Sequence, residues 1–268
     1  MQRRQFLKGS LAVAGGLCVA GGLAGVGYAV AQVAGMNDAI NKSGRQRMLS
    51  QRLAKGYLQV GQSIDPERSR RIVSASADLF EKQLAELKAF APSPENRATL
   101  EEAGRAWVAY KEALTSRAPN AQDAKAVLAL NEDVLALAHA ATVQLEKLSA
   151  SGIGRLVNVS GRQRMLSQRM AKFYQAINWG VAPADAAGKL AQARKEFIAA
   201  LAELAGAPKN TPEINGEIAL VQQQWVFFDN ALSATGGDKA KLALNVATTS
   251  ERILEAMDGI TGMYEKLA

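Results

Sequence analysis

The sequence SGRQRMLSQRLAK at residues 43–55 recurs as SGRQRMLSQRMAK at residues 160–172, and this duplication decides the architecture. Twelve of the thirteen positions are identical, and only Leu53 differs, being replaced by Met170. We call these two segments the first box and the second box. An internal repeat of this kind indicates that one structural unit occurs twice in the chain.

Weaker similarity extends the duplication well beyond the boxes. An offset of 118 residues pairs Trp107 with Trp225, and short apolar strings match near the ends of both repeats. We therefore expect two repeats, at residues 36–150 and 153–268. The two tryptophans are predicted to fill the cores of the two repeats.

The pattern between the breaks is helical throughout. Apolar residues recur at intervals of three and four, and short breaks rich in proline or glycine separate the segments. Short connections make consecutive helices antiparallel. The expected fold is all-α, with two tandem antiparallel four-helix bundles forming a pseudo-two-fold pair. The predicted helices cover residues 36–62, 66–90, 96–118, 122–149, 153–180, 184–205, 212–234 and 238–267.

Composition excludes several classes of protein. With 48% hydrophobic residues, the 268-residue chain is not disordered, and one cysteine rules out a disulfide scaffold. A single histidine, His139, argues against a Cys/His metal site, so we expect no metal and no cofactor. The net charge of +7 would fit a nucleic-acid partner, but the leader argues against that partner.

Residues 1–31 have the pattern of an export signal. Three bases and no acid precede an uncharged stretch at residues 9–37, and the small residues before position 32 predict cleavage after Ala31. The string QRRQFLK at residues 2–8 resembles the twin-arginine export motif, with glutamine in place of the usual hydroxyl residue. We expect a periplasmic protein with no nucleic-acid partner. The alternative is an uncleaved anchor in the inner membrane, since the apolar stretch is long enough to span a bilayer.

Helical geometry gives the first box two faces of buried type. At 100° per residue, Leu49 lies on the side that faces its own bundle, whereas Gly44 and Arg47 lie on the opposite side. That second side is too apolar for solvent and contains small residues that allow another helix to approach. Arg45 and Arg52 lie on a third edge, where we expect contact with water or acidic residues.

The second faces of the two boxes are predicted to meet about a pseudo-two-fold axis. Arg47 and Arg164 would then converge, and two guanidinium groups ~6 Å apart repel by roughly 3 kcal/mol at an effective dielectric constant near 20. A small oxyanion between them would remove this repulsion and accept forked hydrogen bonds from both. The predicted ligand-binding residues are Arg47, Arg164, Gly44 and Gly161, with Met48, Met165, Gln51 and Gln168 as supporting residues.

The boxes also resemble a known family. The string GRQRMLSQR is similar to the N-terminal domain of type IV pilus methyl-accepting chemotaxis transducers, the PilJ-like domain. The shorter pattern Gly-x-x-Arg-Met-x-Ser-x-Arg resembles the periplasmic domain of nitrate/nitrite sensor kinases of the NarX/NarQ kind. In those sensors, four-helix bundles dimerise through their first helices, and one arginine from each subunit grips a nitrate. By position in the motif, these arginines correspond to Arg47 and Arg164.

The resemblance implies a covalent version of that dimer. The related receptors carry a further membrane helix and a signalling module, and neither is visible in this sequence. We therefore expect a protein that binds or senses a small anion, nitrate or nitrite above all, without a signalling output of its own. Its partner would be a membrane sensor kinase, a chemoreceptor or a respiratory protein.

A different class of function remains open at this stage. The arginines could be structural, in which case the chain is a ligand-free helical interaction module. A carboxylate against Arg47 would favour that alternative. We expect no enzyme, because no nucleophile–base pair or phosphate loop is visible. His139 lies in a helix rich in alanine and leucine and is predicted to be a packing or surface residue.

Overall fold

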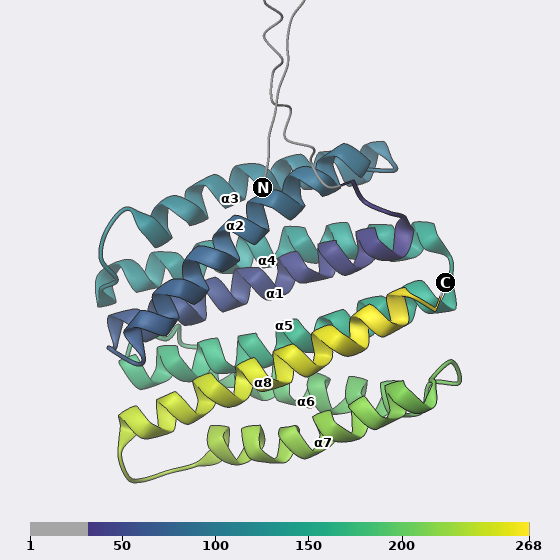
Figure 1. Ribbon diagram of the computed structural model, residues 1–268. Helices are drawn as coiled ribbons and strands as arrows, with labels where there is room; N and C mark the ends of the chain where they lie inside the picture. The colour runs from purple at the N-terminus through teal and green to yellow at the C-terminus, as the bar shows by residue number, and fades with distance from the viewer. Residues whose placement is uncertain (1–31, 268) are drawn as a thin grey trace, which may run out of the picture.

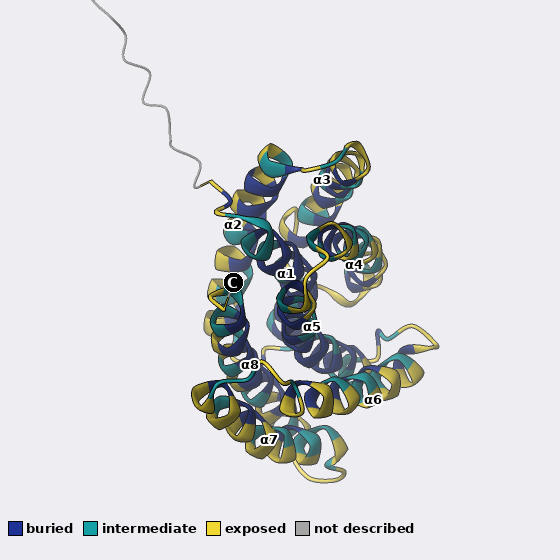
Figure 2. Ribbon diagram, turned by 90° about the vertical axis from the view of Figure 1, so that its right-hand side faces the viewer, coloured by how far each residue is buried: buried dark blue, intermediate teal, exposed yellow. Residues whose placement is uncertain are grey.

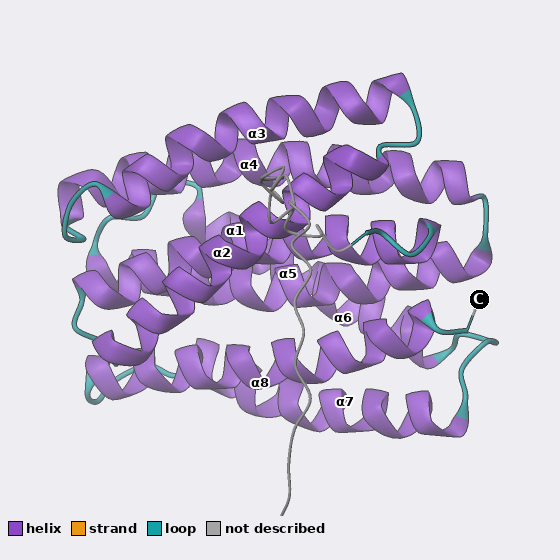
Figure 3. Cartoon of the chain, turned by 45° about the horizontal axis from the view of Figure 1, so that its top comes forward, coloured by secondary structure: helices purple, strands orange, loops and turns teal. Residues whose placement is uncertain are grey.

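The computed structural model describes residues 32–267, and within them all regular structure is helical (Figures 1 and 3). The predicted export signal at residues 1–31 lies outside the described residues. In chain order the helices are α1 (Met36–Gly61), α2 (Pro66–Phe90), α3 (Pro94–Thr115), α4 (Ala121–Ser149), α5 (Gly152–Trp179), α6 (Ala186–Ala205), α7 (Pro212–Ser233) and α8 (Lys239–Glu265).

The eight helices form two bundles of four. In the first repeat α1 packs against α2 and α4, and α3 packs against both α2 and α4. The second repeat has the same arrangement, with α5 in the place of α1 and α6, α7 and α8 in the places of the other three. Figure 2 shows α1 and α5 at the centre, with the remaining helices of each repeat on opposite sides of this pair. The predicted all-α fold of two tandem bundles is confirmed.

The first helices of the repeats lie side by side and run in the same direction. In the first half of both helices, Arg164 of α5 donates to the Oδ1 of Asn41 on α1. Near their ends, Gln62, which follows α1, donates to the backbone oxygen of Gln175 on α5. We call this contact surface between α1 and α5 the inter-repeat seam. It is a parallel pair with reciprocal contacts, as a two-fold relation between equivalent helices requires.

Most helix boundaries follow the sequence signals closely. The largest difference is α3, predicted at residues 96–118 and observed at Pro94–Thr115. It begins earlier because proline needs no hydrogen-bond acceptor in the first turn, and because the Ser93 hydroxyl caps the helix by accepting from the amide of Asn96.

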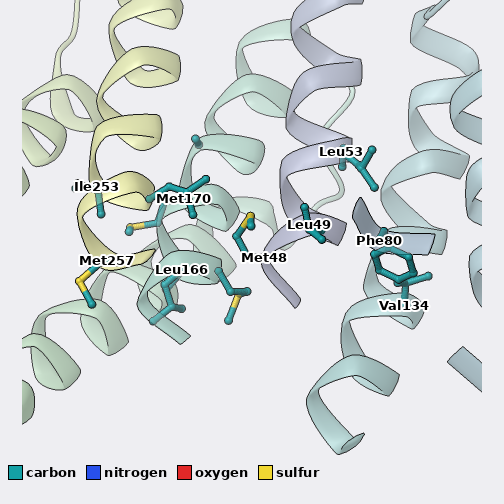
Figure 4. Packing of buried hydrophobic residues seen from close by; sticks show 14 of the residues in the cluster. Met48, Leu49, Leu53, Phe80, Val134, Leu166, Met170, Ile253 and Met257 are labelled. Carbon is teal, nitrogen blue, oxygen red and sulfur yellow. The ribbon is translucent and has the colours of Figure 1, made fainter. Parts of the chain in front are cut away.

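Each bundle has an apolar core built around a stacked aromatic pair. The rings of Phe80 and Trp107 stack with centroids 4.1 Å apart, and those of Phe197 and Trp225 stack at 4.6 Å. Trp107 is buried, whereas Trp225 is only partly buried. Figure 4 shows aliphatic and methionine side chains filling the space around α1, α5 and α8. The predicted core role is confirmed for Trp107, whereas Trp225 packs against the core and stays partly exposed.

Helix α4 is long and apolar enough to cross a membrane. No other helix within residues 32–267 meets this criterion. In the structure it packs along α1 and α3. Its apolar residues therefore serve as a core face of the first bundle.

Ion pairs join the first helix of each repeat to the last helix of the other. Lys55 and Arg52 on α1 both contact the carboxylate of Glu251 on α8. The equivalent pair on α5, Lys172 and Arg169, contacts Glu132 on α4, with the nearest N–O distances 2.6 and 2.8 Å. The Lys55 side chain is fully buried, so it depends on this partner for its charge.

Replacing Glu251 with glutamine should therefore destabilise the whole protein. The variant leaves the Lys55 ammonium buried without a carboxylate, and removing one member of a buried pair costs about 3–5 kcal/mol. Urea unfolding followed by circular dichroism measures this loss. The matched control is Glu67→Gln, in the exposed pair with Arg70, which should change stability by less than about 0.5 kcal/mol. Equal effects of the two substitutions would show that the ion pairs between repeats contribute nothing.

Candidate functional site

The two arginines singled out by the boxes meet at the inter-repeat seam. Arg47 on α1 and Arg164 on α5 are both fully buried. A Cβ atom added to Gly44 would lie 3.2 Å from the Nη2 of Arg47 and 3.6 Å from the Nη2 of Arg164. The equivalent atom on Gly161 would lie 3.0 Å from Arg164 and 3.8 Å from Arg47. Both guanidinium groups thus occupy the space that the two glycines leave open.

Each arginine is held by an asparagine of the other repeat. The Nη2 of Arg47 donates to the Oδ1 of Asn158 at 2.7 Å and to its backbone oxygen at 3.3 Å. The Nη2 of Arg164 donates to the same two atoms of Asn41, at 2.8 and 3.3 Å. Asn41 and Asn158 are separated by 117 residues, the offset of the boxes. The seam therefore contains two equivalent arginine–asparagine contacts that cross from one repeat to the other.

A glutamate orients each of these asparagines. The Nδ2 of Asn158 donates to Glu146, at the end of α4, and the Nδ2 of Asn41 donates to Glu265, at the end of α8. This contact turns the amide so that its oxygen faces the arginine. The sequence analysis missed both asparagines, although the 117-residue offset pairs them two positions before the boxes begin.

The second nitrogen of each guanidinium breaks the symmetry. The Nη1 of Arg164 donates to Asp258 on α8, which also accepts from Arg45 at 2.8 Å. The Nη1 of Arg47 instead lies 3.3 Å from the Nδ1 of His139 on α4. His139 and Asp258 are equivalent positions of the two repeats, 119 residues apart. Arg164 thus has a carboxylate partner, whereas within residues 32–267 Arg47 forms no ion pair.

This difference is reflected in the pKa values. Burial, together with the charges of Arg162 and Arg164, lowers the pKa of Arg47 to about 9. Burial also lowers the pKa of Arg164, to about 10, against the opposing effect of Asp258. Burial and the neighbouring Arg47 lower the pKa of His139 to about 4. At neutral pH both arginines are therefore charged and His139 is neutral, so its Nδ1 accepts from Arg47 and its proton resides on Nε2.

The supporting residues lie around this centre. Met48 and Met165 are buried in the apolar core. Gln51 donates to the Oδ1 of Asn131 at 3.0 Å, and Gln168 donates to the backbone oxygen of Ser250 at 3.0 Å. Both glutamines therefore bind the last helix of their own repeat, which helps to fix the rotation of α1 and α5. Gln51 also accepts from the Nη1 of Arg169 of the other repeat at 3.4 Å.

The third edge of the first box carries ion pairs. Arg45 pairs with Asp258 and Arg52 with Glu251, and both arginines are about one-fifth exposed. The expectation for this edge is confirmed. The two acidic partners come from α8, so the edge also joins the repeats.

A cavity of about 300 Å³ opens beside Arg47, between α4, α5 and α6. It reaches Arg47 and His139 but does not include Arg164 among its lining residues. His139, predicted to be a packing or surface residue, instead lies in its wall in contact with Arg47. The signal that could have found it is the alignment of α4 with α8, which places it opposite Asp258.

The buried arginines retain capacity to bind an anion. The Nε atoms of Arg47 and Arg164 are both buried and have no hydrogen-bond partner among residues 32–267. An unpaired buried donor is costly, and an anion is the acceptor that best suits a guanidinium. Over the described part of the chain, no cluster of three or more metal-ligating side chains is present.

The fold and this polar centre define a class: a duplicated helical bundle whose first helices bury a pair of arginines. The family model for the type IV pili methyl-accepting chemotaxis transducer N-terminal domain, PilJ, matches residues 28–142 and again residues 148–250. The chain belongs to the PilJ family and contains two copies of its domain, a sensory module of receptors. Neither a curated protein nor a solved structure matches this chain.

Filling the space beside the arginines should destabilise the seam. In Gly161→Ala the new Cβ would lie 3.0 Å from the Nη2 of Arg164, which is held in place by Asn41. Gly216→Ala, in α7, is the matched control because nothing lies within 4 Å of its Cβ, and it should gain up to about 1 kcal/mol of helix stability. We expect Gly161→Ala to be less stable than this control by about 1–3 kcal/mol in urea unfolding. Equal stabilities would mean that the glycine is not needed for close approach.

The contact between His139 and Arg47 predicts a pH-dependent stability. Because the pKa of His139 is about 4 in the folded protein, against 6.5 for a free side chain, the unfolded chain binds the proton more strongly. The free energy of unfolding should fall as the pH drops from 6.5 towards 4, by about 1–2 kcal/mol after allowance for partial solvent exposure.

In His139→Asn this component should be missing from unfolding curves measured across the same pH range. The difference between the two proteins removes the contribution of carboxylates, which titrate in both. An identical slope for wild type and variant would show that folding does not lower the pKa of His139.

Proposed function

We propose that this protein is a periplasmic sensing module that binds a small inorganic anion at the inter-repeat seam, with Arg47 and Arg164 as the clamp. The observation that carries the proposal is the convergence of two fully buried guanidinium groups, of which only Arg164 has a carboxylate partner. Positive charge is thus buried in excess of its local compensation, and a bound anion would neutralise it.

The chemistry of the clamp favours a small oxyanion. Guanidinium groups form forked hydrogen bonds to planar oxygen acceptors, and the two unpaired Nε donors supply one contact from each side. The likeness of the boxes to the nitrate/nitrite sensors makes nitrate or nitrite the leading candidate. Gly44 and Gly161 support the proposal because they leave room for the guanidinium groups at the point where the helices are closest.

The residues of this centre have no catalytic arrangement that we can assign, so the proposed role is binding. Exported through its leader, the protein would pass its ligand state to a separate membrane sensor kinase, chemoreceptor or respiratory protein. An anion held between α1 and α5 would contact both repeats at once, and its loss would alter how the bundles pack. A partner protein could recognise the altered packing of the bundles and thereby respond to the presence of the ligand.

A specific observation supports a second function, that of a ligand-free interaction module. Asp258 already neutralises Arg164, and Asn41 and Asn158 satisfy one nitrogen of each arginine. Under this alternative the arginines serve only to join the two repeats. The two functions differ in whether an added anion binds and stabilises the protein.

Calorimetric titration of the full chain with nitrate, nitrite, sulfate and chloride tests the proposal. We expect saturable one-to-one binding of one anion. The affinity should fall at least roughly 30-fold in Arg47→Gln/Arg164→Gln, because each substitution removes a buried charged donor. The variant Arg47→Lys/Arg164→Lys keeps the positive charges but cannot form forked hydrogen bonds. Its affinity should therefore lie between those of the wild type and the double glutamine variant.

The matched control is Arg155→Gln, on the same helix as Arg164, where the side chain is exposed and paired with Glu203. It removes one positive charge outside the seam and should leave the affinity unchanged. Absence of binding by every anion, combined with loss of stability in the double glutamine variant, would establish the arginines as structural and the protein as an interaction module.

A further inference from the structure

The cavity between α4, α5 and α6 is lined by both apolar and charged residues, and the proposed anion clamp gives no role to the apolar ones. One part of its wall is apolar, and four basic side chains and two acidic ones surround that part. The apolar residues are Leu135, Ala136, Met165, Leu166 and Ala193, and the basic residues are Arg47, Arg162, Arg169 and Lys189. A volume of about 300 Å³ is at the lower end of the range for ligand-binding pockets.

Three of the four bases already have carboxylate partners. Arg162 pairs with Glu196 at 2.6 Å and Arg169 with Glu132 at 2.8 Å. Lys189 pairs with Asp185 at 3.0 Å. Among the lining bases, Arg47 is the one for which residues 32–267 provide no ion pair, and its side chain is fully buried behind the cavity wall. Of the four bases, Arg47 is therefore the one whose charge an anion from the cavity would compensate.

His139 adds a second donor beside Arg47. Its Nδ1 accepts from Arg47, so the proton of the neutral ring is on Nε2 and can be donated to an acceptor in the cavity. A charged and a neutral donor next to an apolar wall suit a carboxylate attached to a hydrocarbon body. Nitrate or sulfate would leave the apolar wall uncovered.

In the other repeat, the equivalent arginine already has a carboxylate partner. On α8, Asp258 stands where α4 has His139, and Glu255 stands where α4 has Ala136. The carboxylate of Asp258 accepts a hydrogen bond directly from Arg164. Within the described part of the chain, one arginine thus has a carboxylate partner, and the other, beside the cavity, has none.

We propose that this cavity binds a small organic monocarboxylate, whose carboxylate pairs with Arg47 and His139 and whose apolar body lies against Leu135, Met165 and Ala193. In this position the ligand would reproduce for Arg47 the contact that Asp258 makes with Arg164. The inference goes beyond the clamp, because it uses Arg47 from the α4 side and does not involve Arg164.

Three probes separate the contributions of charge and apolar surface. Benzoate carries both, benzamide keeps the shape without the charge, and acetate keeps the charge without the ring. Calorimetric titration of the full chain should show saturable one-to-one binding of benzoate, at least about tenfold tighter than either of the other two. Benzoate binding no tighter than benzamide overturns the proposal, because the carboxylate would then not meet Arg47.

Two variants locate the site. Ala193→Leu fills the buried wall of the cavity, and Ala136→Glu places at its exposed rim the residue found at the equivalent position of α8. Both should weaken benzoate binding at least about tenfold, by loss of volume and by repulsion. Ala136 is exposed, so that variant is expected to fold even if Ala193→Leu does not, and circular dichroism melting checks both.

Arg164→Gln distinguishes this cavity from the clamp. Benzoate affinity should survive this substitution, whereas nitrate affinity at the clamp should be lost. In Ala193→Leu, benzoate affinity should fall and nitrate affinity at the clamp should be retained. Benzoate binding that falls equally in Arg164→Gln, or that is unchanged in a folded Ala136→Glu protein, overturns the cavity site. Benzoate binding with no response to inorganic anions would overturn the clamp alone.

Discussion

Two arginines buried between parallel helices are the constraint on which the rest of the molecule depends. A guanidinium group cannot be left in a protein interior without acceptors, since the cost of removing its charge from water is several kcal/mol. Here one acceptor of each arginine comes from the other repeat, because Arg47 binds Asn158 and Arg164 binds Asn41. Each arginine also contacts the last helix of its own repeat, Arg47 at His139 and Arg164 at Asp258. The repeats are therefore joined by polar contacts of defined geometry, whereas apolar packing by itself would tolerate many alignments of α1 against α5.

The remaining features of the seam support this arrangement. Gly44 and Gly161 allow the helices to approach where the guanidinium groups lie. Glutamates at the ends of α4 and α8 orient the two asparagines, and further glutamates on the same helices pair with the lysines and arginines at the end of each box. Because α4 and α8 each contact both first helices, a ligand that alters the seam would also move the outer helices. If the proposed anion binds at the seam, this connection would provide a physical path from it to the surface of the module.

The sequence alone predicted the architecture because the duplication was nearly perfect in the boxes and the breaks between helices were short. It also placed Arg47 and Arg164 on the face that meets the other repeat. It did not find Asn41 and Asn158, because single asparagines outside the boxes carry no signal until a structure shows what they contact. It also assigned His139 to packing or to the surface. The importance of His139 lies in its equivalence to Asp258 in the other repeat. These two residues are 119 positions apart, whereas the boxes are 117 positions apart, so the box alignment does not pair them.

The claim that the seam is an anion site is tested most directly by locating an anion there. Crystals grown or soaked in bromide, a monovalent anion that scatters anomalously, would reveal bound halide without assumptions about affinity in solution. The account predicts an anomalous peak within hydrogen-bonding distance of the guanidinium groups of both Arg47 and Arg164, which nitrate displaces when added in excess. A map with surface peaks but none at this position, with the arginines bound only by Asn41, Asn158 and Asp258, would contradict it. The arginines would then be structural links between the repeats.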